Sequence, residues 1–158
     1  MKDREQMIRW IADRVHHEYY TYDTNCATVT LLCLSHIYDI PLGEQLLHAA
    51  TGMHGAGGYR AQCGLVEGSL MFLGILGREK GMSKEEIVAL CYRYGESFET
   101  RFGSLTCRGL RPGGFRVDDP PHLCETLTNR SILFTFDFIE GALQESKVLA
   151  EKDVPENV

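Results

Sequence analysis

The sequence has little that would tie the chain to a membrane or to nucleic acid. Its longest apolar run, 70–76, is far shorter than the about 20 residues that span a bilayer. The first residues, MKDREQMIRW, are charged and lack the apolar segment of a signal peptide. The net charge is −6, and no stripe of Lys and Arg alternates with aromatic residues, which argues against a nucleic-acid partner. We therefore expect a cytoplasmic protein that neither inserts into a membrane nor binds nucleic acid.

Two familiar arrangements of metal-binding or redox residues are also missing. No Cys-x-x-Cys pair occurs, which argues against a thioredoxin-like mechanism. No predicted helix carries a His-x-x-x-His or Glu-x-x-His motif. Iron–sulfur clusters and zinc sites commonly include one short chelating pair of cysteines, so its absence ranks such sites below thiol chemistry.

Regular alternation of apolar and polar residues is absent as well, and helical spacing dominates. The residues Ser83-Lys84-Glu85-Glu86 form a capping box that starts one helix. The segment 63–78 is apolar on nearly all sides, so we expect it to be the central, buried helix. The other predicted helices cover 3–20, 25–38, 43–50, 84–102 and the segment that opens at 119–121. The sequence thus predicts an all-α, single-domain bundle of five or six helices around segment 63–78.

The length of 158 residues fits one domain with its own core. We expect a helical domain over 1–144, followed by a polar C-terminal tail over 145–158 that frays. The connection 103–121 is long and rich in Gly, Pro and Arg, and such loops are usually functional or mobile.

Cysteine is the residue that this chain has in excess, with six copies. Structural disulfides are rare in the cytoplasm, so spaced cysteines there indicate a catalytic, redox-sensing or metal-binding role. Two of them lie in mid-helix among apolar neighbours and are interpreted as core residues, Cys33 and Cys91. The other four lie at predicted helix starts or in the arginine-rich connection, where a thiolate is favoured, and we expect them to converge: Cys26, Cys63, Cys107 and Cys124.

Cys63 is expected to be the most reactive of these because it combines a helix start with access through the glycine-rich loop 52–58. Glu67 follows one turn later on the same face. If buried, it could carry a proton to or from a thiol, and otherwise it would face solvent or pair with an arginine. His54 and His122 could tune a nearby thiolate through a hydrogen bond.

The residues Cys63-Gly64-Leu65-Val66-Glu67-Gly68, with the cysteines at 26, 107 and 124, resemble a family named C_GCAxxG_C_C. Its members carry four spaced cysteines and a Cys-Gly-Ala-x-x-Gly motif, and Leu65 stands here in place of the alanine. Residues 25–27, 55–58 and 101–108 are similar to the family too, so the resemblance covers about 22–127. It implies a small bacterial or archaeal redox protein, without naming a reaction.

Three functions are compatible with these features. In the first, Cys26, Cys63, Cys107 and Cys124 are catalytic, with Glu67, and cycle between dithiol and disulfide with a redox protein or a small thiol. In the second, the same four cysteines bind an iron–sulfur cluster or zinc. In the third, the chain is a non-enzymatic helical adaptor with incidental cysteines or a structural zinc. The sequence names no electron partner and leaves open whether the chain forms a homodimer.

Overall fold

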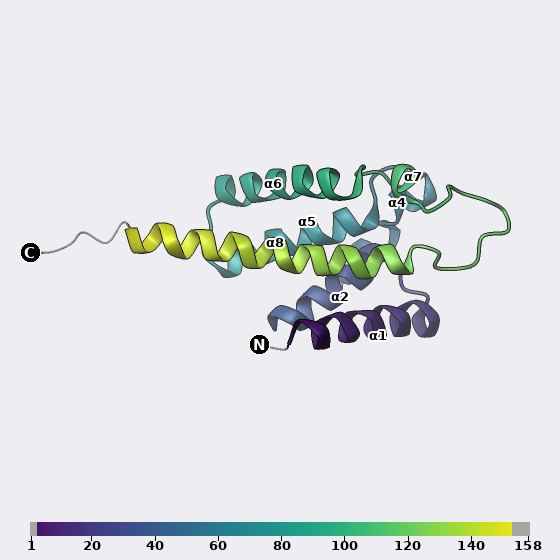
Figure 1. Cartoon of the computed structure of the whole chain (residues 1–158), viewed down its shortest axis with the longest axis horizontal. Helices are drawn as coiled ribbons and strands as arrows, with labels where there is room; N and C mark the ends of the chain where they lie inside the picture. The colour runs from purple at the N-terminus through teal and green to yellow at the C-terminus, as the bar shows by residue number, and fades with distance from the viewer. Residues whose placement is uncertain (1–2, 153–158) are drawn as a thin grey trace, which may run out of the picture.

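The computed structural model describes residues 3–152 and shows a bundle of helices (Figure 1). The helices are α1 (Arg4–Tyr22), α2 (Cys26–Tyr38), α3 (Glu44–Ala49), α4 (Gly55–Gly58), α5 (Gly64–Glu79), α6 (Lys84–Phe102), α7 (Cys107–Leu110) and α8 (Glu125–Lys152), with a 3-10 turn, η1 (Ala50–Gly52), after α3. Extended pairing within the described residues is limited to one isolated bridge between Gln62 and Thr106. The all-α, single-domain fold is confirmed. No helix in this part of the chain is long and apolar enough to cross a membrane.

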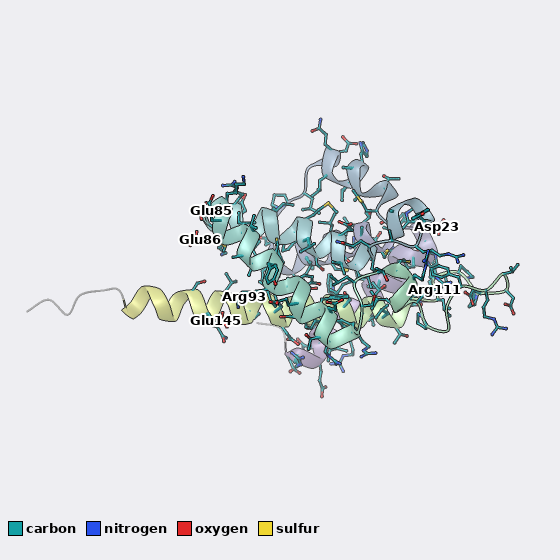
Figure 2. The ribbon with its side chains drawn as sticks, turned by 90° about the horizontal axis from the view of Figure 1, so that it is seen from above. Asp23, Glu85, Glu86, Arg93, Arg111 and Glu145 are labelled. Carbon is teal, nitrogen blue, oxygen red and sulfur yellow. The ribbon has the colours of Figure 1, made fainter. Side chains whose placement is uncertain are left out.

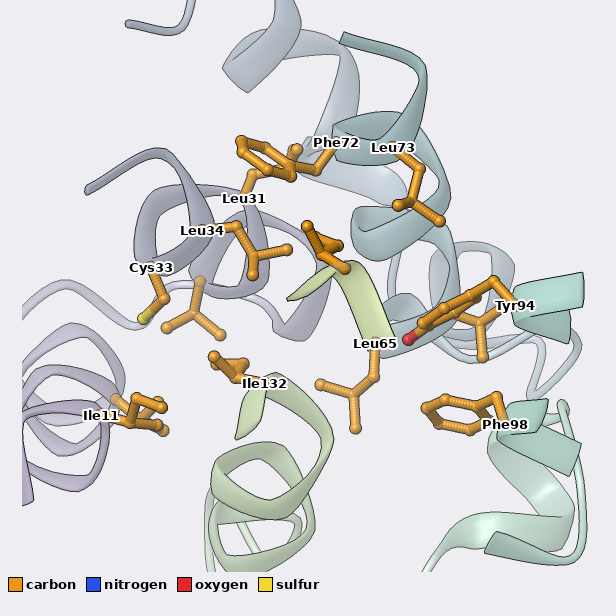
Figure 3. Close-up of a cluster of buried hydrophobic side chains, with 14 of the residues drawn as sticks. Ile11, Leu31, Cys33, Leu34, Leu65, Phe72, Leu73, Tyr94, Phe98 and Ile132 are labelled. Carbon is orange, nitrogen blue, oxygen red and sulfur yellow. The ribbon is translucent and has the colours of Figure 1, made fainter. Parts of the chain in front are cut away.

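Helix α5 lies at the centre of the bundle and packs against α2, α6 and α8. Figure 3 shows its Leu65, Phe72 and Leu73 among side chains of the surrounding helices, including Leu34 of α2 and Ile132 of α8. This arrangement confirms the prediction that the apolar segment 63–78 forms the central helix, because its apolar residues have neighbours on several sides.

Glycine at position 68 allows α2 and α5 to approach closely. A Cβ atom at Gly68 would lie only 2.5 Å from the carbonyl oxygen of Ala27 in α2. Any larger residue would therefore push the two helices apart, and overpacking of this kind typically costs about 1–3 kcal/mol.

The last helix begins later than the sequence predicts. We expected Asp119 to cap a helix that starts near residue 120, but α8 begins at Glu125. Asp119 instead accepts hydrogen bonds from the Arg116 backbone N–H, at 2.9 Å, and from Arg111, at 3.2 Å, so its carboxylate stabilises the loop. Helix α8 continues through Lys152, so the first part of the predicted polar tail is helical. The rest of that tail, 153–158, lies outside the described residues.

Several helices begin at the same end of the bundle, which we call the cysteine end. Helices α2, α5 and α8 begin there, and the short α4 and α7 lie there (Figure 1). The glycine-rich loop forms a left-handed turn over 55–58, with φ values between 55° and 85°. Glycine adopts such angles readily, whereas they are strained for Ala56. The turn lets the chain double back between η1 and the start of α5.

Candidate functional site

Each of the four predicted cysteines lies at the start of a helix at the cysteine end. Cys26 is the first residue of α2, Cys63 is the N-cap of α5, and Cys107 is the first residue of α7. Cys124 directly precedes α8, and its carbonyl oxygen accepts a hydrogen bond from the Thr128 N–H at 2.8 Å. Backbone N–H groups are unpaired at a helix start and favour an anion there. The pKa of Cys63 is lowered, whereas those of Cys26, Cys107 and Cys124 are raised.

Backbone pairing fixes the positions of Cys63 and Cys107 relative to each other. The Cys63 N–H donates to the Leu105 carbonyl at 2.9 Å, and the Cys107 N–H donates to the Ala61 carbonyl at 2.6 Å. These bonds flank the isolated bridge between Gln62 and Thr106. Because side chains alternate along extended backbone, Cys63 and Cys107 lie on the same side of this short ribbon.

Asn25 attaches the start of α2 to the rest of the site. Its side-chain oxygen caps the helix by accepting the Thr28 N–H at 2.9 Å. Its side-chain nitrogen donates to the carbonyl oxygens of Ala50 and Thr51, at 2.9 and 2.7 Å. One side chain therefore holds Cys26 beside the segment that leads into the glycine-rich turn.

The structure brings all four thiols close enough to influence one another electrostatically. The pKa of the Cys26 thiol is raised well above its ordinary value, first by its hydrogen bond to Cys63 and then by burial. The negative charges that Cys63, Cys107 and Cys124 would carry raise it further. Mutual repulsion of this kind means that the four sulfurs do not all ionise together.

Cys26 and Cys63 form the most closely coupled pair. The Cys26 thiol donates a hydrogen bond to the Cys63 sulfur, and this bond is the main reason that the pKa of Cys63 is lowered. The backbone N–H groups of Leu65 and Val66 lower it further, whereas burial opposes the shift. Cys63 is thus favoured as the thiolate and Cys26 as its proton-bearing partner.

Gly64 is required for this pair to form. A Cβ atom at this position would overlap the Cys26 sulfur and the backbone carbonyl oxygen of Met53. The glycine that follows the cysteine in the sequence motif therefore makes room for the second sulfur of the pair.

Access to Cys63 differs from the prediction. Cys63 is only 5% exposed, because it packs into the cluster of buried apolar residues. A Cβ atom at Gly55 of the glycine-rich turn would lie 3.0 Å from the Cys107 sulfur. Of the four cysteines, Cys26, Cys107 and Cys124 are partly exposed.

A cavity of about 610 Å³ opens at the cysteine end, and Cys26, Cys107 and Cys124 line it. Volumes of this size are typical of small-molecule sites. Arg60 and Arg111 also line the cavity, with Phe115 between them. Their guanidinium carbons lie 4.0 and 4.9 Å from the centre of the Phe115 ring, which places both in cation–π contact.

The arginines act on the cysteines beside them. One Arg111 nitrogen lies 3.9 Å from the Cys124 sulfur, and another pairs with Asp119 at 3.2 Å. Arg111 and Arg60 lower the pKa of Cys107, but burial and the neighbouring thiolates raise it more. Arg111 belongs to the arginine-rich connection 103–121 that the sequence predicts around Cys107. Arg60 was missed, and the bend before Cys63 brings it to the same wall.

Neither predicted histidine forms a hydrogen bond with a thiol in the described part of the chain. His122 lines the cavity, stacks on Tyr19 with ring centres 4.5 Å apart, and pairs with Asp23 at 3.0 Å. His54 also lines the cavity but is exposed. The contacts of His122 position the cavity wall, and neither histidine provides the expected direct tuning of a thiolate.

Glu67 lies within electrostatic reach of Cys63. Its side chain is partly buried, and its negative charge raises the pKa of that thiol. Within the described residues it has no hydrogen-bond or ion-pair partner, so the alternative pairing with an arginine is not formed.

The same cysteines do not form a ready metal site. Among the side chains that the structure describes, no group of three or more His, Cys, Asp or Glu is placed to hold a metal ion. Four thiolates can bind zinc or an iron–sulfur cluster only when all point at one centre. The residues present therefore do not fit either group.

The helical bundle gathers four cysteines at one end, beside a cavity that three of them line. The comparison with known families agrees: a model described as "Putative redox-active protein (C_GCAxxG_C_C)" matches residues 24–137. The chain belongs to this family, because the match covers most of its length and includes all four cysteines. The family's description supports a redox role in general terms. No curated protein and no solved structure matches the chain.

Proposed function

We propose that this protein carries out thiol–disulfide exchange and that Cys26 and Cys63 are the dithiol that becomes a disulfide. The observation that carries the proposal is the placement of the Cys26 sulfur against Gly64, the residue that follows Cys63 at the start of α5. The interaction between the two thiols raises the pKa of Cys26 and lowers that of Cys63. A thiolate is the nucleophile in disulfide exchange, so a pair with one favoured thiolate is prepared for the reaction.

The reaction balances as the transfer of two electrons and two protons from the protein to a substrate disulfide. A substrate disulfide RS–SR first meets the sulfurs that line the cavity, which are Cys26, Cys107 and Cys124. One of these sulfurs loses its proton and attacks, which breaks the S–S bond, forms a mixed disulfide and releases RS⁻, which takes a proton. The Cys63 thiolate then attacks the protein sulfur of the mixed disulfide and releases the second RS⁻, which also takes a proton. Where Cys107 or Cys124 was attacked first, Cys26 then displaces that cysteine from Cys63, which leaves Cys26 and Cys63 joined. Each step breaks one S–S bond and forms another.

Glu67 has a supporting role in this proposal. Cys26 must lose its proton before its sulfur can bond to Cys63, and a partly buried carboxylate without a partner can accept a proton. The effect of the Glu67 charge on the pKa of Cys63 indicates that the carboxylate lies near the pair.

The test is to map disulfides after oxidation. Protein purified without oxygen is treated with one equivalent of a small disulfide, free thiols are blocked by alkylation at low pH, and the linked peptides are identified by mass spectrometry. We expect Cys26 linked to Cys63 and two electrons removed per chain. Cys26 and Cys63 both remaining free would overturn the proposal. Stoichiometric iron or zinc in the same preparation, with thiols protected from alkylation, would favour the metal-binding alternative instead.

A further inference from the structure

The charge of the cavity differs from that of the protein around it. The chain carries a net charge of −6, yet two arginines lie on the cavity wall, and its one lining carboxylate belongs to Asp23. Asp23 is 93% exposed at its side chain and pairs with His122, so it lies at the edge of the cavity. Arg111 is paired with Asp119, so the positive charge on the wall that has no carboxylate partner among the described residues is that of Arg60, and it attracts anionic ligands.

We propose that the cavity binds a small disulfide that carries carboxylate groups and that Arg60 is the residue that selects it. This inference rests on the proposed thiol–disulfide exchange and names its substrate class. The three cysteines on the wall supply the sulfur chemistry, and the arginines supply recognition of the carboxylate.

Arg60 and Arg111 differ in their availability to a ligand. Arg111 is already engaged, because it pairs with Asp119 and contacts the Cys124 sulfur, and its side chain is only 18% exposed. Arg60 is exposed and pairs with no carboxylate among the described residues. Its guanidinium is held 4.0 Å from the centre of the Phe115 ring, so it is positioned before a ligand arrives. Arg60 is therefore free to accept a carboxylate, while Arg111 holds the wall in place.

The geometry also sets the orientation of the substrate. Arg60 and Cys107 are neighbours, because the Arg108 N–H donates to the Arg60 carbonyl at 3.2 Å and the Arg60 charge acts on the Cys107 thiol. A substrate whose carboxylate pairs with Arg60 would place its disulfide against the half-buried Cys107. Binding and reaction thus use adjacent residues on one wall.

The experiment compares three small disulfides of different charge with the reduced protein. Oxidised glutathione carries net negative charge, bis(2-hydroxyethyl) disulfide is neutral, and cystamine is positive. Rates of oxidation are followed by the loss of free thiols at fixed pH and ionic strength, and each is divided by the rate of the same disulfide with a free small thiol. We expect a preference of roughly tenfold or more for the anionic disulfide over the cationic one, falling as salt is added.

The variant Arg60→Gln tests the assigned residue. We expect the ratio of the anionic rate to the neutral rate to fall severalfold, and this ratio cancels any general change in the reactivity of Cys107. The control is Arg93→Gln, which removes an exposed arginine that pairs with Glu145. Figure 2 shows these two residues well away from Asp23 and Arg111, so the ratio should not change in this control.

The outcomes separate this inference from the proposed function. Oxidation by all three disulfides without a charge preference, or an unchanged ratio in Arg60→Gln, would overturn the inference and leave exchange itself intact. Reaction with an unfolded protein disulfide at a far higher rate than with oxidised glutathione would also overturn it, in favour of a protein partner. Failure of every disulfide to oxidise Cys26 and Cys63 would instead contradict the proposed function.

Discussion

Cys33 and Cys63 are both buried, but the pKa values of their thiols are shifted in opposite directions. Cys33 lies in the middle of α2 with no exposed surface, and burial raises its pKa to about 12. Cys63 is nearly as buried at the start of α5, yet its pKa is lowered, because it accepts a hydrogen bond from Cys26 and faces backbone N–H groups. Burial alone makes a thiol inert, whereas burial with donors directed at the sulfur stabilises the thiolate.

The largest expected effect is that of Cys63→Ser on oxidation. Serine is a preferred N-cap residue, so α5 should still begin at the same place and the fold should be retained. Without the sulfur, no disulfide can form with Cys26, and we expect oxidation of Cys26 by a small disulfide to stop short of an intramolecular bond. Peptide mapping measures this, with Cys91→Ser as the control. An intramolecular disulfide at Cys26 in Cys63→Ser would show that Cys26 has a different partner.

The next effect concerns the glycine that separates the two sulfurs. Gly64→Ala should lower the free energy of unfolding by about 1–3 kcal/mol, because the new methyl group overlaps the Cys26 sulfur and the Met53 carbonyl. It should also raise the pKa of Cys63 by displacing the hydrogen-bond donor. Gly74→Ala in the same helix is the matched control. No atom lies within 4 Å of its new Cβ, so it should stabilise the protein by up to about 1 kcal/mol.

Thermal or urea unfolding measures the free energy of unfolding of both variants. If Gly64→Ala is as stable as Gly74→Ala, the close contact between α2 and α5 at Cys26 is not required.

A smaller effect is expected for Cys33→Ala. Removing one buried sulfur should cost about 1–2 kcal/mol, because Cys33 belongs to the cluster of buried apolar residues and its loss leaves a small cavity there. The rate and products of oxidation should not change. Unfolding and disulfide mapping measure the two properties separately, and a loss of oxidation in this variant would mean that Cys33 belongs with the reactive cysteines.

Local signals in the sequence were enough to predict most helices. The capping box of Ser83 and Glu86 is present, with bonds of 2.7 and 3.2 Å, because both partners lie within one turn. Asp119 had the same kind of local signal, but Arg111 and the Arg116 backbone hold its carboxylate elsewhere. A cap can be predicted from neighbours in sequence only when no residue outside the turn competes for it.

The geometry of the site could not be predicted, because it depends on contacts between segments that are distant in the sequence. The motif around Cys63 identified the four cysteines, and helix starts explained why each could be reactive. The contact of Cys26 with Gly64 and the placement of Arg60 beside Cys107 arise from the packing of separate segments. For the same reason, the open access predicted for Cys63 was wrong, because Cys63 packs into the buried apolar cluster while most of the glycine-rich loop lies at the surface.

The measurement that tests the difference between Cys63 and Cys33 most directly is a pH titration of thiolate absorbance in the ultraviolet, on the reduced protein and three variants. We expect a thiolate that forms below the pH at which an ordinary cysteine ionises, is lost in Cys63→Ser, and is unchanged in Cys33→Ala. In Cys26→Ala its titration should move to higher pH, because the hydrogen-bond donor is gone. A low-pH thiolate that persists in Cys63→Ser, or that does not respond to Cys26→Ala, would contradict the assignment of Cys26 and Cys63 as the reactive pair.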